Sequence, residues 1–102
     1  MKGVSDAAHE LGLAMHMDGA RLLNAAVASG RPASDYAKLC DTTWIDLSKG
    51  LGCPVGAVLV GSKDAIYEAW HWKHQFGGSM RQAGIDKALT AVRAVANEVR
   101  PN

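Results

Sequence analysis

Residues 42–60 read TTWIDLSKGLGCPVGAVLV, and this stretch decides the fold. Its first part, 42–47, is rich in β-branched and aromatic residues, which is typical of a strand. A glycine-rich turn follows, and 55–60 is a second apolar strand. The link between the two strands is too short for a helical crossover, so we expect them to pair antiparallel.

The sequence on either side of this stretch predicts one more strand and several helices. The strand covers 13–17 and ends at Asp18, and the helices between it and residue 42 allow a parallel pairing with 42–47. The predicted helices run over Ser5–Leu11, Arg21–Ser29, Ser34–Leu39, Lys63 to about Phe76, and Gln82–Val99. Glycines are expected to end these helices, and Ser34 and Ser62 to cap two of them. This order predicts an α/β fold with about three strands, two parallel and one antiparallel at an edge.

Length, composition and charge exclude several classes of protein. At 102 residues the chain is at most one domain, and its hydrophobic fraction of 48% suffices for a core. The net charge is +1 and the basic residues are scattered, so the sequence shows no basic patch of the kind that binds nucleic acid or an anionic membrane. No apolar run is long enough to span a bilayer, and the two cysteines form no CxxC pair. We therefore expect a reducing compartment, the cytoplasm or an organelle matrix.

Lys49 is the candidate for covalent chemistry. It lies in a Ser-Lys-Gly turn directly after an apolar strand. In α/β sheets, ligands bind at the carboxyl ends of the strands, which is the position of this turn. A catalytic lysine must be neutral to attack an aldehyde, so a desolvated pocket or a neighbouring cation is expected. An exposed lysine in a glycine turn is the alternative, which Lys-Gly alone favours. The position of Lys49 between two apolar strands supports the catalytic interpretation.

Asp18 and Arg21 follow the other parallel strand. A carboxylate can hold the ring nitrogen of pyridoxal phosphate, and a guanidinium can bind a substrate carboxylate in a bidentate way. With the amine of Lys49, these are the groups that a pyridoxal-phosphate enzyme requires. Asp18 could instead cap the helix that follows it, and Arg21 could be a solvated residue of the first helical turn.

One arginine and three histidines are further candidates for a functional site. Arg81 precedes the longest predicted helix, and the start of a helix favours a contact with a phosphate. The alternative is an ordinary exposed side chain. His71 and His74 are three apart on a helix, but no third ligand completes a set, so no metal site is predicted. His16 shares a strand face with Asp18 and could line the pocket, although a core histidine is the default interpretation.

Three motifs in this order resemble the low-specificity L-threonine aldolases, of the β-eliminating lyase group of fold-type I pyridoxal-phosphate enzymes. The motifs are HMDGARL (16–22), LSKGLG-x-PVG (47–56) and GG-x-MRQAG (77–84). The resemblance implies that Lys49 is the Schiff-base lysine and that Asp18 is the partner of the pyridine nitrogen. It implies that Arg21 lies near the substrate carboxylate and the cofactor's phenolic oxygen, and that Arg81 reaches a cofactor phosphate from a neighbouring subunit. Ser48 is a further candidate contact to the cofactor.

The resemblance also implies the reaction and the extent of the domain. The cofactor is pyridoxal 5'-phosphate, and the reaction is retro-aldol cleavage of L-threonine or L-allo-threonine, a β-hydroxy-α-amino acid, to glycine and acetaldehyde. A homo-oligomer without nucleic-acid or membrane partners is expected. Residues 1–102 correspond to the C-terminal half of the large cofactor-binding domain, without the small domain, and the chain alone is expected to be inactive. The alternatives are another pyridoxal-phosphate lyase or transferase, or a non-catalytic remnant that acts as an interaction module.

Overall fold

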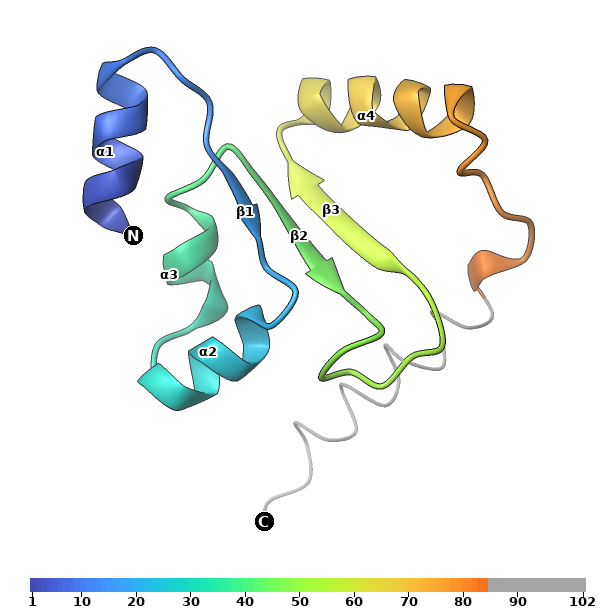
Figure 1. Cartoon of the computed structure of the whole chain (residues 1–102), viewed down its shortest axis with the longest axis horizontal. Coiled ribbons are helices and arrows are strands. Elements are labelled where there is room, and N and C mark those ends of the chain that lie inside the picture. Colours follow the sequence, from blue (N-terminus) through green and yellow to red (C-terminus); the bar gives the residue numbers. More distant parts are fainter. Residues whose placement is uncertain (85–102) are drawn as a thin grey trace.

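The structure, a computed structural model, describes residues 1–84. Figure 1 shows a small sheet with helices grouped beside one edge strand and a further helix that follows the strand at the other edge. The elements, in chain order, are α1 (Lys2–Glu10), β1 (His16–Asp18), α2 (Leu22–Ser29), α3 (Ala33–Ala37), β2 (Thr42–Asp46), β3 (Ala57–Gly61) and α4 (Lys63–Gln75).

The three strands form one mixed sheet in the order β1-β2-β3. β1 and β2 are parallel, with Asp18 opposite Trp44, and β2 and β3 are antiparallel, with Asp46 opposite Ala57. In Figure 1, β1 and β2 therefore end at the same edge, near α2, and β3 returns in the opposite direction. The predicted α/β class and the predicted directions of all three strands are confirmed.

The signals that end or cap helices were correct at several positions. Gly30 adopts the left-handed conformation at φ 67° and ends α2, as expected of a residue without a Cβ. The hydroxyl of Ser62 accepts a hydrogen bond from the amide of Ala65 and caps α4. The predicted cap at Ser34 is wrong, because α3 begins at Ala33 with Pro32 at its N-cap. Most of the predicted helix over 82–99 lies outside the described residues, and Gln82 itself, at φ 53°, is not helical.

Two strands, β1 and β3, begin later than predicted, for reasons visible in the backbone. The amide of Leu13 donates to the carbonyl of Ala8, so the residues after α1 close back on that helix before β1 begins. The carbonyl of Gly56 accepts from the amide of Leu47, and Gly56 has φ 120°. This turn delays regular pairing until Ala57, so β3 begins two residues later than predicted.

The two faces of the sheet have different surroundings. Strand side chains alternate, so Met17 and Thr43 lie on one face and Asp18 and Trp44 on the other. The first face packs toward α2 and α3, and it contains Thr43, which is 4% exposed, beside the buried Leu22. The second face carries the polar side chains that end β1 and β2, and it is the more exposed of the two.

β3 is the least protected strand. All of its residues are exposed, including Val58, Leu59 and Val60 at 45%, 41% and 51% of their surface. Within residues 1–84, β3 pairs with β2 alone, so its outer edge has no strand partner. Over the same residues, no helix is long and apolar enough to cross a membrane.

Thr43→Val is expected to stabilise the fold. The Thr43 hydroxyl is buried and has no hydrogen-bond partner among the described residues. An unsatisfied buried hydroxyl costs free energy, so an isosteric methyl should raise the free energy of unfolding by about 1 kcal/mol. Urea unfolding of both proteins measures the change. Thr42→Val is the matched control, because the Thr42 hydroxyl is hydrogen-bonded to His16 Nδ1 at 2.8 Å, and its loss should give no gain.

Candidate active site

The candidate site lies at the edge where β1 and β2 end. Asp18 is the last residue of β1, and Asp46 is the last residue of β2, directly before the turn that carries Lys49. Leu47 is buried beneath this turn, and its carbonyl accepts from the amide of Cys53 at 2.8 Å. The topology therefore brings the polar ends of two parallel strands together, the usual position of ligand sites in α/β sheets.

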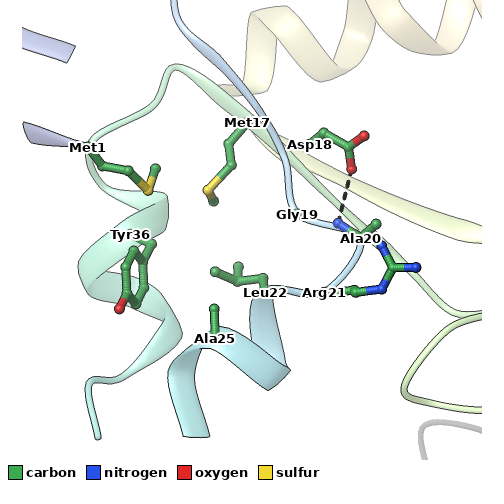
Figure 2. Close-up of a pocket in the computed structure, with 9 residues that line it drawn as sticks. All are labelled: Met1, Met17, Asp18, Gly19, Ala20, Arg21, Leu22, Ala25 and Tyr36. Atoms are coloured by element: carbon green, nitrogen blue, oxygen red, sulfur yellow. Dashed lines mark hydrogen bonds between the residues drawn. The ribbon is translucent and has the colours of Figure 1, made fainter. Parts of the chain in front are cut away.

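The Asp18 carboxylate is held by two donors on one oxygen. Its Oδ1 accepts from the indole Nε1 of Trp44 at 2.6 Å and from the amide of Ala20 at 3.1 Å. The bond to Ala20 closes a turn before α2, but the N-cap of α2 is Arg21 and no side chain caps this helix, so the capping alternative for Asp18 is wrong. Figure 2 shows this bond, with the carboxylate directed away from the apolar side chains of Met17 and Leu22.

Gly19 allows the close approach that places Asp18 and Arg21. Its amide donates to the carbonyl of Trp44 at 2.9 Å, and a Cβ at this position would overlap that same carbonyl oxygen. Any larger residue would push β1 away from β2 at the point where the site forms. Arg21 follows at the N-cap of α2, with its side chain exposed.

The turn with Lys49 is organised by Asp46. Oδ1 of Asp46 accepts from the hydroxyl of Ser48 at 2.6 Å and from its amide at 2.8 Å. These two hydrogen bonds are the main reason that the pKa of Asp46 lies below its ordinary value. Desolvation opposes them, and the positive charges of Lys49 and Arg21 lower the pKa further. Lys49 and Arg21 thus lie within electrostatic reach of the same carboxylate.

Asp46→Asn is expected to remove a pH-dependent part of the stability. The folded-state pKa of Asp46 is lowered, so its contribution is present above about pH 3.8, its ordinary value, and is lost as the pH falls through the folded pKa. The unfolding midpoint in urea should therefore be higher for the unaltered chain than for the variant near neutral pH, and the difference should shrink below pH 3.8. Ser48→Ala removes the largest cause and should weaken the same pH dependence; a difference that stays constant with pH would contradict the assignment.

A hollow of about 440 Å³ adjoins the site but does not contain Lys49. Its apolar lining comes from side chains that face one another in Figure 2: Met1, Met17, Leu22, Ala25 and Tyr36. Asp18 and Arg21 stand at its border, and their charged groups point to the other side. Lys49 itself is exposed, so the desolvated pocket expected around it is not formed by the described residues.

The remaining predicted residues lie elsewhere or have other partners. Arg81 is exposed in the segment after α4, and Figure 1 shows this segment, coloured orange, on the far side of β3 from α2. Ser48 uses its hydroxyl to hold Asp46. His16 is exposed and bonded to Thr42, so neither the pocket nor the core alternative applies. No group of three metal-ligating side chains occurs in the described part of the chain, which includes His71 and His74.

Two functional candidates were missed from the sequence. Trp44 bonds to Asp18, and Asp46 organises the lysine turn. Strand alternation alone places residues 44 and 46 on one face of β2, whereas the register that sets Trp44 opposite Asp18 is known only from the structure.

Comparison with known proteins gives one consistent answer. A family model described as β-eliminating lyase matches residues 1–101. The chain is 44% identical over 99 residues to a low specificity L-threonine aldolase of Escherichia coli O157:H7, a match that covers 97% of this chain and 29% of that protein. It is 43% identical over 95 residues to a low-specificity L-threonine aldolase of Candida albicans, covering 93% of this chain and 25% of that one.

A solved structure agrees with these matches. A protein from Listeria monocytogenes, provisionally described as an L-allo-threonine aldolase, superposes with a TM-score of 0.72 at 34% identity, covering 74% of this chain and 21% of that one. The likeness confirms the fold class. The chain spans less than a third of the length of each of these relatives.

Proposed function

The chain belongs to the β-eliminating lyase family, and from this premise we propose that it carries the lysine-bearing part of a pyridoxal-phosphate-dependent aldolase. The substrate class is a β-hydroxy-α-amino acid, such as L-threonine or L-allo-threonine, cleaved to glycine and acetaldehyde. Support comes from relatives named low-specificity L-threonine aldolases and from the order of the three motifs in this chain.

One observation carries the proposal. The ends of β1 and β2, with the segments that follow them, bring three different chemical groups to one edge of the sheet near Trp44 and Asp46: those of Asp18, Arg21 and Lys49. An amine, a carboxylate and a guanidinium are the chemical groups that pyridoxal phosphate and an amino-acid substrate require. The residues present therefore fit the cofactor at its ring and its aldehyde.

Each of these side chains has a task that follows from its chemistry. Lys49 would hold the cofactor through its amine, which can condense with the cofactor's aldehyde with release of water. Asp18 would accept a hydrogen bond from the protonated ring nitrogen, and Arg21 would bind the substrate carboxylate with two parallel hydrogen bonds. When bound, pyridoxal phosphate withdraws the electrons released by the breaking carbon–carbon bond.

The proposal extends to the assembly. We propose a cytoplasmic homo-oligomer in which Arg81 contacts the cofactor phosphate of a neighbouring subunit. Arg81 is exposed, and the segment after α4 that carries it lies on the far side of β3 from α2 in Figure 1, which supports a role across a subunit boundary. Its place in the GG-x-MRQAG motif supports the phosphate as its target.

Covalent labelling tests the proposed function directly. The chain is incubated with pyridoxal phosphate, reduced with borohydride, digested and mapped by mass spectrometry. We expect the pyridoxyl group on Lys49, because it alone of the described lysines stands at the edge where β1 and β2 end.

Two variants control for non-specific reaction of lysines. Lys49→Arg keeps the charge and should abolish the specific label. Lys63→Arg, in the first turn of α4, should leave it unchanged. Label distributed evenly over all lysines of the unaltered chain would refute the assignment.

A further inference from the structure

The two oxygens of Asp18 have unequal surroundings. Oδ1 receives both of the described hydrogen bonds, from the Trp44 indole at 2.6 Å and from the Ala20 amide at 3.1 Å. A carboxylate oxygen offers about two acceptor positions, so these donors fill Oδ1. No donor among the described residues bonds to Oδ2, which leaves that oxygen for a ligand.

The position of Trp44 follows from the sheet. In the parallel register Asp18 lies opposite Trp44, so both side chains stand on the same face. The backbones are tied at the same point, since the amide of Gly19 donates to the Trp44 carbonyl at 2.9 Å. Main chain and side chain of one residue of β2 therefore fix the end of β1.

The indole bond restricts the rotation of the carboxylate. If the Ala20 amide were the only donor, Asp18 would have one local hydrogen bond, and exposed turn residues make and break such bonds readily. A second donor, delivered from a different strand, selects one orientation of the carboxylate plane. At 2.6 Å this is the shorter of the two bonds.

We propose that Trp44 is a positioning residue that holds Oδ1 of Asp18, so that Oδ2 is presented to the ring nitrogen of pyridoxal phosphate. This inference rests on the proposed function, because it requires that the cofactor binds here. Trp44 touches neither the cofactor nor the substrate in this role and acts only through Asp18.

The contact itself is tested in the cofactor-free chain by NMR of ¹⁵N-labelled tryptophan. Three indole N–H signals are expected, from Trp44, Trp70 and Trp72, and Trp44→Phe identifies the first by its loss. Asp18→Ala should shift the Trp44 signal and accelerate its exchange with solvent, while the other two signals stay in place. An unchanged Trp44 signal would overturn the contact and the proposal with it.

The effect on the cofactor is measured by ¹⁵N NMR of its ring nitrogen. The full chain is loaded with pyridoxal phosphate labelled with ¹⁵N at the ring nitrogen, whose chemical shift reports protonation of that atom. Trp44→Phe keeps an aromatic side chain in β2 but removes the donor, and should move this shift toward that of the free cofactor. It should also weaken cofactor binding roughly tenfold. Trp72→Phe, on α4 and stacked on Phe76, is the matched control and should change neither value.

The outcomes separate the two proposals. If the unaltered chain forms no adduct at Lys49, the proposed function fails, and the role of Trp44 fails with it. If the adduct forms, and Trp44→Phe gives the same ring-nitrogen shift and the same affinity as the unaltered chain, the role of Trp44 alone is refuted.

Discussion

The chain by itself is expected to release no measurable acetaldehyde from L-threonine, with or without added pyridoxal phosphate. Asp18, Arg21 and Lys49 are all exposed in the described structure, so water competes for each charged group that the reaction needs. Electrostatic stabilisation of a transition state depends on a site from which water is excluded. The edge that holds these residues supplies the chemical groups without that enclosure.

The same residues should support catalysis inside a longer relative. In a chimera, this chain replaces the matched segment of the Escherichia coli protein, to which it is 44% identical over 99 residues. Acetaldehyde release is measured for the chimera, for the chain alone and for a chimera with Lys49→Ala as the background. Cleavage by the chain alone at a rate near that of the relative would show that it builds the whole site, for example by self-association.

Asp18→Ala and Arg21→Ala are expected to impair this chimera in different ways. Without the carboxylate, the ring nitrogen loses the partner that keeps it protonated, so kcat should fall, by about 10²–10³-fold if the loss resembles that of other preorganised electrostatic groups. Without the guanidinium, the substrate carboxylate loses its bidentate partner. KM should then rise, because substrate binding should weaken by roughly 2–5 kcal/mol if the pair is buried in the complete enzyme.

Steady-state kinetics with L-threonine separates the two effects. Lys63→Ala, on the exposed face of α4, is the control for changes in expression and folding. A chimera with Asp18→Ala that keeps its kcat would refute the role of Asp18 at the pyridine ring. A KM unaffected by Arg21→Ala would place the substrate carboxylate elsewhere.

Much of the fold could be predicted because local chemistry agrees with tertiary structure. Gly30 tolerates a left-handed φ, Ser62 offers a hydroxyl to a helix amide, and both ended or began helices at the predicted places. The antiparallel pairing of β2 with β3 followed from the length of a loop. Ser34 failed as a cap because the preceding Pro32, with its fixed φ of −63°, already starts the turn of α3.

The site could be predicted only at the level of residue types. That Asp18 and the turn of Lys49 lie at the same edge of the sheet follows from two parallel strands, but the hydrogen bonds that hold Asp18 and that turn come from Trp44 and Asp46. Those bonds depend on strand register, which no local motif encodes. Residue types could not decide between a desolvated pocket around Lys49 and the exposed position that the structure has, because burial depends on what covers the open face of the sheet.

Among the described residues, the outer edge of β3 has no strand partner, so strands that could pair there compete in a way that depends on concentration. A completing strand carried on the same polypeptide would meet this edge at an effective concentration of roughly 1 mM. A second molecule meets it only at the bulk concentration, so at about 1 μM the tethered strand has an advantage of about a thousandfold. The advantage disappears when this chain is made alone. Its exposed Val58, Leu59 and Val60 should then make yield and recovery depend on how dilute the protein is kept.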